Sequence, residues 1–222
     1  DYTSSLGLNV GLDYTYYNYP STQDYINKTE SSEQLFLADA SQTINRWNVY
    51  AGQTHTLPSD WELNYGIDFT FAKDKSSQIY RPQDGSDMSG LNSCTDLKEE
   101  TYNFYGGVEK SFNDKLSLSL SVAGEYYKLM NYKKWAVYPA MQLSYALSDS
   151  HIFQLGFSSD KTYPEYWTIQ ESVSYMNGYA MLLGNPALRP STDYTAELTY
   201  VLKNKYMFNV YYSYIKDLFN QL

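Results

Sequence analysis

The chain has 222 residues, a net charge of −9 and a single cysteine, Cys94, so an internal disulfide is excluded. A nucleic-acid partner is also disfavoured, because the sequence has no basic cluster to meet phosphates. Mean hydropathy is −0.53, and no apolar run is long enough for a membrane-spanning helix. Tyrosine is enriched, with 26 residues, which is typical of strands and membrane interfaces.

Alternation of apolar and polar residues predicts long two-faced strands along most of the chain. In the first, Leu8, Val10 and Leu12 share one face, and Pro20 is expected to end the strand. Pro139 lies inside a later strand, where its missing N–H predicts a bulge. Residues 34–38 fit a short helix or a strand. The main strands are predicted at residues 6–19, 44–57, 61–71, 101–112, 116–128, 135–147, 151–159, 193–202 and 206–216.

The lengths of the predicted connections alternate along the chain. In a meander of antiparallel hairpins, alternate connections lie at opposite ends of the sheet, so every tight turn is expected at one end. Short turns at one end and long loops at the other are typical of outer-membrane barrels. Long polar loops are predicted at 20–43, 73–99 and 160–192, a moderate connection at 129–134, and tight turns at 58–60, 113–115, 148–150 and 203–205.

The two faces of each strand differ in the solvent that they suit. Leu118 and Leu120 lie on an apolar face, whereas Ser119 and Ser121 lie on a polar one. In a membrane barrel the apolar face meets lipid and the polar face lines a wet lumen or contacts a plug. A soluble up-and-down β-barrel that binds a small apolar ligand would invert the two faces, and the alternation alone fits both arrangements.

A proline-rich stretch separates the last long loop from the strand at 193–202. It reads Leu-Gly-Asn-Pro-Ala-Leu-Arg-Pro-Ser-Thr over residues 183–192. Gly184 tolerates a positive φ, and neither Pro186 nor Pro190 donates a ladder bond, so the stretch predicts a stop followed by a new strand. The turn motif consists of Gly184, Asn185, Pro186, Leu188 and Pro190.

This motif, with Tyr163-Pro164-x-x-Trp167 upstream, resembles the Gly-Asn-Pro-x-Leu-Lys-Pro-Glu signature of TonB-dependent outer-membrane receptors. The match is to the barrel branch common in Bacteroidetes. Arg189 keeps the charge of the usual Lys, Ser191 lacks the charge of the usual Glu, and Tyr163 stands where the family tends to carry Arg.

The resemblance implies a location in the cell outer membrane, with lipid and TonB as partners, and uptake of an unknown scarce nutrient. Such receptors have about 22 strands around a plug. We therefore expect an all-β fold, an antiparallel up-and-down meander of about nine long strands that forms part of a transmembrane β-barrel. Residues 1–222 would be one partial barrel domain of a longer chain, without the plug, the TonB-contacting segment and the closing strands. Its open strand edges predict self-association in isolation.

The resemblance also implies that extracellular loops help to bind and enclose the ligand. Rigid aromatic rings suit this task, because they offer contact area at low entropy cost. The alternative is that these rings only anchor the loop against the barrel rim. The ligand-loop candidates in 160–192 are Tyr163, Tyr166, Trp167, Tyr175 and Tyr179.

No catalytic, cofactor or metal motif stands out, so we expect no enzyme activity, no cofactor and no metal. His55 and His151 lie near tight turns at the same end of the predicted sheet, where a joint metal site competes with two unrelated histidines. An outer-membrane enzyme is disfavoured, because the contiguous turn Ser148-Asp149-Ser150-His151 cannot adopt triad geometry. The second loop carries Cys94, which we interpret as incidental, and Asp84, Asp87 and Asp96, which fit either a calcium site or a solvated acidic loop.

Overall fold

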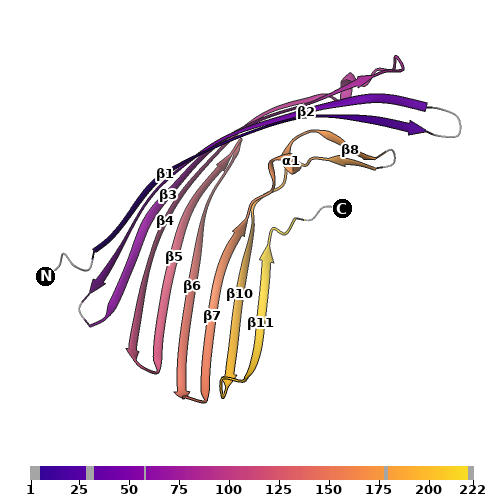
Figure 1. Ribbon diagram of the computed structural model, residues 1–222. Helices are drawn as coiled ribbons and strands as arrows, with labels where there is room; N and C mark the ends of the chain where they lie inside the picture. The colour runs from indigo at the N-terminus through magenta and orange to yellow at the C-terminus, as the bar shows by residue number, and fades with distance from the viewer. Residues whose placement is uncertain (1–5, 29–32, 58, 178–179, 220–222) are drawn as a thin grey trace.

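The computed structural model describes residues 6–28, 33–57, 59–177 and 180–219. Nine strands form one antiparallel sheet in which sequence neighbours pair, so the expected meander of about nine long strands is confirmed (Figure 1). A separate two-stranded sheet, β8 (Val173–Asn177) with β9 (Ala180–Leu183), lies between β7 and β10 in the chain. The main strands are β1 (Leu6–Lys28), β2 (Glu33–Leu57), β3 (Trp61–Pro82), β4 (Ser93–Asn113), β5 (Leu116–Leu129), β6 (Tyr132–Ser148), β7 (His151–Thr162), β10 (Ser191–Leu202) and β11 (Tyr206–Lys216).

Two short helices complete the described chain, the 3₁₀ helix η2 (Ser89–Leu91) and α1 (Tyr166–Ile169). Neither of these described helices has the length and apolar content needed to cross a bilayer.

The connections lie at two ends of the sheet, as the sequence predicts. The tight turns after β2, β4, β6 and β10 share the lower end in Figure 1, and the other connections lie at the upper end. At the lower end, Ser59, Asp60, Lys203 and Asn204 adopt positive φ values between 51° and 66°. Pro58, the first residue of the predicted turn 58–60, lies outside the described residues.

Most of residues 20–43 belong to strands, which corrects the predicted polar loop. β1 runs through Pro20, and its register with β2 is unbroken from Pro20 opposite Ser41 to Lys28 opposite Glu33. Pro20 is tolerated because β1 is an edge strand, where a missing N–H need not cost a ladder bond. The apolar alternation stops before the strands do, so the length of the two-faced pattern underestimates the length of the strands. The segment 34–38 is part of β2.

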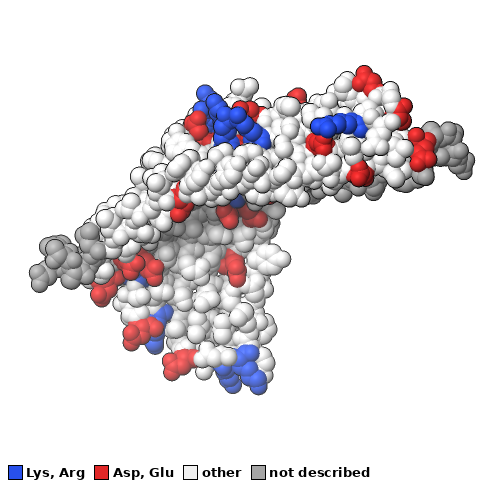
Figure 2. All heavy atoms as spheres, turned by 45° about the horizontal axis from the view of Figure 1, so that its top comes forward, with Lys and Arg blue, Asp and Glu red and all other residues white. Residues whose placement is uncertain are grey.

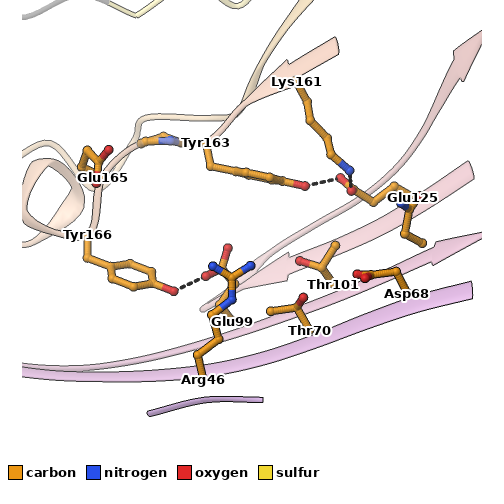
Figure 3. A pocket seen from close by; sticks show the side chains of 12 residues that line it. Arg46, Asp68, Thr70, Glu99, Thr101, Glu125, Lys161, Tyr163, Glu165 and Tyr166 are labelled. Carbon is orange, nitrogen blue, oxygen red and sulfur yellow. Dashed lines mark hydrogen bonds and ion pairs between the residues drawn. The ribbon is translucent and has the colours of Figure 1, made fainter. Parts of the chain in front are cut away.

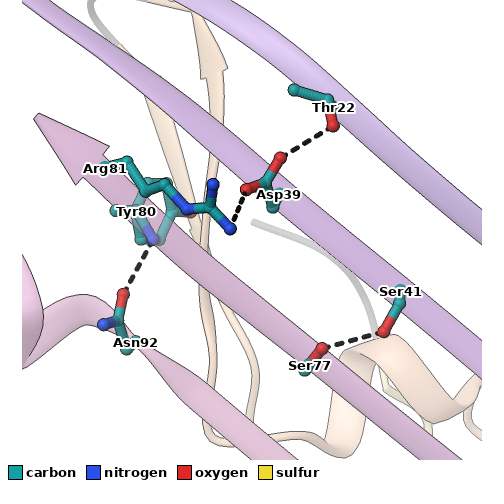
Figure 4. A network of polar contacts seen from close by, with 7 residues as sticks. All are labelled: Thr22, Asp39, Ser41, Ser77, Tyr80, Arg81 and Asn92. Carbon is teal, nitrogen blue, oxygen red and sulfur yellow. Dashed lines mark hydrogen bonds and ion pairs between the residues drawn. The ribbon is translucent and has the colours of Figure 1, made fainter. Parts of the chain in front are cut away.

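Polar side chains tie these extensions of β1, β2 and β3 together (Figure 4). Asp39 accepts a hydrogen bond from Thr22 at 2.7 Å and pairs with the Arg81 guanidinium at 2.9 Å, so it links three strands. The Tyr80 backbone N–H donates to Asn92 Oδ1 at 2.7 Å and holds the connection to β4. The extended hairpins are therefore braced from strand to strand by side chains as well as by the ladder.

The predicted loop 73–99 is also too long, because β3 ends at Pro82 and β4 begins at Ser93. Cys94 is consequently an exposed strand residue, opposite Ser77, and not a loop residue. The connection predicted at 129–134 is a tight turn, since Leu129 already pairs with Tyr132. It lies at the upper end of the sheet, so the expectation that every tight turn shares one end is wrong for this turn. Met130 makes this turn possible with a φ of 54°.

Pro139 causes no bulge against β5, which corrects another prediction from the sequence. Its register opposite Val122 on β5 is regular. On the side of β7, where the missing N–H would have donated, the described β6–β7 ladder ends at Met141 opposite Phe157. There, Ser159 Oγ donates to the Pro139 carbonyl at 2.7 Å in place of a ladder bond. The register shifts lie elsewhere, next to the tight turns, at Ser111/Asn113 and at Ala146/Ser148.

The sheet has an apolar face and a polar face, as the alternation predicts. Large apolar side chains stand exposed on the apolar face, for example Leu8 at 67%, Val10 at 65% and Leu12 at 63%. Two aromatic rows bound this face. The upper row contains Tyr14, Trp47, Phe71, Tyr102, Tyr126 and Trp135, and the lower row contains Trp61, Phe112, Phe153, Tyr200 and Phe208.

The spacing of the rows matches a bilayer. From Trp61 to Phe71 the chain rises about 34 Å along β3, which at a tilt of about 45° gives a band about 25 Å tall. We call this band, between the two aromatic rows, the apolar band.

Two small hydrophobic cores lie on the polar face, above the apolar band. One joins the extensions of β2 and β3 to the loop before β4 through Phe36, Ala38, Tyr80 and Met88. The other contains Leu97, Tyr127, Leu129 and Ile169, with Leu188 packed against it. The second core fixes the segment after β7 against β4 and β5, and that segment builds the candidate site.

Candidate functional site

The segment that follows β7 folds onto the polar face and is held by buried carboxylates. The Tyr163 hydroxyl donates to Glu125 Oε1 on β5 at 2.6 Å, and the Tyr166 hydroxyl donates to Glu99 on β4. Both tyrosine rings pack against the second core. Burial raises the pKa of Tyr163 and of Tyr166, so both hydroxyls stay protonated donors at neutral pH.

Asp74 on β3 is a second anchor for the same segment. Its side chain is 1% exposed. Its carboxylate accepts hydrogen bonds from Gln170 Nε2 at 3.1 Å and from Gln42 Nε2 on β2 at 2.6 Å. Burial raises the pKa of Asp74, and the hydrogen bonds from Gln42, Ser76 and Gln170 oppose that rise. The Tyr80 hydroxyl adds a bond to the Val173 carbonyl, so β3 holds both ends of residues 170–173.

A polar pocket of about 440 Å³ remains between this segment and the sheet (Figure 3). Strands β2 to β5 form its floor, and Lys161 and the chain around Tyr163 and Tyr166 form its roof. The charged residues that line it are Arg46, Asp68, Glu99, Glu125, Lys161 and Glu165, with Thr70, Thr101 and Asn103 among the polar ones.

The pocket contains groups that the described chain leaves unpaired. Asn103 Oδ1 is buried and accepts no hydrogen bond from any described residue. Arg46 makes no ion pair with any side chain in the described ranges, whereas Lys161 pairs with Glu125. Four carboxylates face two cationic side chains across the pocket. An acidic, hydroxyl-lined pocket suits a polar ligand that donates hydrogen bonds, and it does not suit an apolar one.

The structure separates the five ligand-loop candidates. Tyr163 and Tyr166 line the pocket while their hydroxyls are bound to the sheet. Trp167 is 47% exposed and lines a neighbouring hollow over β1 to β4. Tyr175 lies in β8, and Tyr179 lies outside the described residues. The contacts of Tyr163 and Tyr166 are those of an anchor, while their position is that of a pocket wall.

The turn motif packs beside this segment. The Asn185 N–H donates to the Thr168 carbonyl at 2.6 Å, the Ala187 N–H donates to Asn185 Oδ1 at 2.9 Å, and Leu188 joins the second core. Gly184 is required here for a reason other than the one we expected. Its φ is not positive, but a Cβ on it would lie 1.7 Å from the Gln170 carbonyl oxygen. Pro186 and Pro190 line a hollow with Tyr132, over whose ring Arg189 stacks at 4.7 Å.

The remaining candidates are not brought together. His55 contacts Tyr65 and His151 contacts Tyr200, on strands with four others between them, about 24 Å apart across the sheet. Hydrogen bonding to Ser86 and to Ser89, through the side chain first and the backbone N–H second, lowers the pKa of Asp84 and of Asp87 respectively. Asp96 pairs with Lys73 at 3.2 Å. Among the described residues, no group of three or more His, Cys, Asp and Glu side chains is placed to hold a metal.

Sequence reasoning missed most of the pocket. Alternation puts Asp68 and Glu125 on the polar faces of the predicted strands 61–71 and 116–128, but Glu99 lies inside the predicted loop 73–99. No pattern in the sequence singles out Arg46, Asn103 or Lys161. The available signal was the presence of charged residues well inside strands, where Ser, Thr and Gly otherwise fill the polar face.

Comparisons with known proteins agree with this fold. A family model described as the outer membrane protein beta-barrel family matches residues 3–222. No curated protein matches the chain significantly. A solved structure titled "Copper transporter OprC" is similar, with a TM-score of 0.67 at 10% identity. The likeness covers 97% of this chain and 37% of that one, so the chain spans little more than a third of that transporter's length. At this identity the likeness establishes the fold alone.

Proposed function

Because the chain belongs to the outer membrane protein beta-barrel family, and so is located in the outer membrane, we propose that it is a section of a receptor barrel that takes up a nutrient. The apolar band faces lipid, and the polar face lines the lumen. The single observation that carries the proposal is the polar pocket, which sits on the luminal face at the end of the sheet that bears the long connections. Membership of an outer-membrane family disfavours the alternative of a soluble barrel with an apolar interior.

The energy source belongs to the same proposal. The motif Gly184-Asn185-Pro186 with Leu188 and Pro190 supports a TonB-dependent receptor, whose plug and TonB-contacting segment would lie elsewhere in the polypeptide. In this proposal the chain has no catalytic role, and the protein acts by binding and passage.

The pocket supports a polar organic nutrient over copper as the ligand. No His, Cys or Met lines it, although imidazole and sulfur ligands are those that copper favours. Carboxylates, threonine hydroxyls and the free Asn103 oxygen instead match hydroxyl and amine donors on a ligand.

Depletion of a defined medium tests the proposal. Cells that produce the full-length protein would be grown in a mixture of short oligosaccharides, short peptides and Cu²⁺, and consumption of each solute would be followed by mass spectrometry. We expect deletion of the protein, and separately of TonB, to leave the same polar organic solute unconsumed. Asn103→Leu should reduce its uptake, whereas Ser119→Thr, on the same face below the pocket, should not.

Three outcomes would contradict parts of the proposal. Unchanged consumption after deletion of the protein would remove transport altogether. A defect confined to Cu²⁺ would remove the polar organic ligand. A defect that deletion of TonB does not share would remove the energy source.

A further inference from the structure

Lysines gather on the apolar face immediately above the upper aromatic row. Lys73 follows Phe71 by two residues, Lys128 follows Tyr126 by two, and Lys133 precedes Trp135 by two. The even spacing keeps each lysine on the face of its aromatic neighbour. Figure 2 shows basic side chains gathered near the upper end of the sheet, with acidic ones beside them. We call Lys73, Lys75, Lys98, Lys128 and Lys133 the lysine cluster.

The cluster carries uncompensated positive charge in a chain whose net charge is −9. Lys98 lies directly opposite Lys73, and Lys128 lies directly opposite Lys133. Like charges directly opposite each other destabilise a strand pair. Two acidic residues relieve only part of this, with Asp96 at 3.2 Å from Lys73 and Glu100 at 2.7 Å from Lys128. Lys98 and Lys133 are exposed, and neither lies within 4.0 Å of an acidic group in the described ranges, although Glu100 also attracts Lys133 at longer range.

Below the cluster, the apolar band contains a hollow of about 530 Å³ on the same face. Gly106 is one of its lining residues, and a Cβ at this position would have no atom closer than 3.9 Å. A Cβ at Gly124, between the hollow and the cluster, would meet no atom within 4 Å, so the surface stays open upward. The hollow is lined by Leu63, Gly106, Leu120, Val122, Met141 and Phe157, among others.

The separation of the two features fits one lipid. From Val122 to Lys128 the chain rises about 20 Å along β5, which at a tilt of about 45° is about 14 Å of depth. One leaflet supplies about half of the roughly 30 Å hydrocarbon core. A lipid whose phosphate lies among the lysines therefore has an acyl chain long enough to reach the hollow.

We propose that this surface binds a phosphorylated lipid of the outer leaflet, with its phosphate at the lysine cluster and an acyl chain in the hollow below. Lysine ammonium groups attract lipid phosphates as point charges, and near a membrane surface each lysine strengthens the binding of an anionic lipid several-fold. The lipid site and the polar pocket lie on opposite faces of the sheet. The lipid proposal therefore depends on the membrane location of the chain and does not depend on the proposed transport function.

Binding by the full-length protein in phosphatidylcholine nanodiscs tests the proposal. The probe is a lipid A that carries two phosphates, and the bound lipid is counted by native mass spectrometry. The double variant Lys98→Gln/Lys133→Gln removes the two exposed charges that make no close ion pair, and glutamine keeps much of the side-chain length. We expect its affinity for the lipid to fall about 25-fold, or about fivefold per lysine. The control Lys115→Gln/Lys205→Gln, at the opposite end of the sheet, should bind as the unaltered protein does.

Two further measurements test the lipid itself. Two single variants, Gly106→Leu and Leu120→Phe, should each weaken binding of the long-chain lipid by partly filling the hollow. Leu120→Phe replaces no glycine, so it tests the hollow without altering the conformational freedom of the backbone. Neither should weaken binding of a short-chain analogue with the same phosphates.

The proposal is overturned if the lysine double variant binds lipid A as tightly as the control does. It is also overturned if dephosphorylated lipid A binds equally well, or if millimolar inorganic phosphate displaces the bound lipid. Equal binding of long-chain and short-chain lipids would remove the acyl chain from the hollow.

Discussion

The lower and upper parts of the sheet are stabilised by different surroundings. In the apolar band, residues such as Leu8 and Val10 remain more than 60% exposed, and the described side chains bury no core of their own. Above the band, two small cores, the Asp74 anchor and the Asp39 links tie strands to one another. The lower part therefore depends on lipid for the burial of its apolar area, whereas the upper part is stabilised by contacts within the chain.

The largest expected effect follows from removing the lipid. In buffer without detergent, the chain of residues 1–222 should form dimers or larger aggregates, because its exposed apolar band and the open edges of β1 and β11 both favour association. Light scattering measures this directly. A compact, monodisperse monomer under these conditions would contradict the dependence of the lower part on lipid.

A smaller effect distinguishes the two faces within the band. Leu120→Arg should reduce folding into lipid vesicles, because arginine at the midplane on the lipid face costs about 2–4 kcal/mol. Ser119→Arg adds the same charge one residue away, on the wet face and opposite Glu109, and should be nearly silent. Folded fractions on gels report both variants in the full-length protein. Equal folding, or a worse result for Ser119→Arg, would contradict the assignment of the faces.

In the upper part, Gly184→Ala should loosen the segment at 163–173 without unfolding the band. The added Cβ meets the Gln170 carbonyl, and relief of such overpacking costs about 1–3 kcal/mol. Hydrogen exchange should show faster exchange at Thr168 to Val173 and unchanged exchange in β5 and β6. Gly90→Ala is the matched control, because its Cβ would meet nothing within 4 Å. Equal protection from exchange in the two variants would show that the close contact between residue 184 and the Gln170 carbonyl does not affect the stability of the segment.

The smallest expected effect is a pH dependence at Asp74. Burial raises the pKa of this carboxyl in the folded state, so the folded state holds its proton at pH values where an undocked segment releases it. Stability of docking is therefore greatest below the usual carboxyl pKa and falls as pH rises through the window up to the raised value. The protection factor of the Gln170 amide, corrected for intrinsic exchange, should increase on acidification. Asp74→Asn should flatten this increase, and an unchanged slope in the variant would contradict the role of Asp74.

The sequence by itself determined the lower part of this protein. Alternation with period two specifies which face each residue takes, and turn residues such as Asn113-Asp114-Lys115 mark where strands reverse, so the strand order and the sorted ends followed without coordinates. The same signal failed above the band. Strands there carry polar residues on both faces with only a few buried apolar ones, so residues 20–43 and 73–99 resembled loops although long ladders pair most of them.

Only the tertiary structure decided what the upper part does. Tyr163 meets Glu125 across 38 residues of sequence, and Gln170 meets Asp74 across 96, and no local pattern encodes contacts of that range. The need for glycine at 184 came from a neighbouring carbonyl and not from its own φ. The pocket arises where strands β2 to β5 and the segment after β7 bring isolated charges together. Alternation is a property of one strand, whereas a site of this kind is a property of several strands in register.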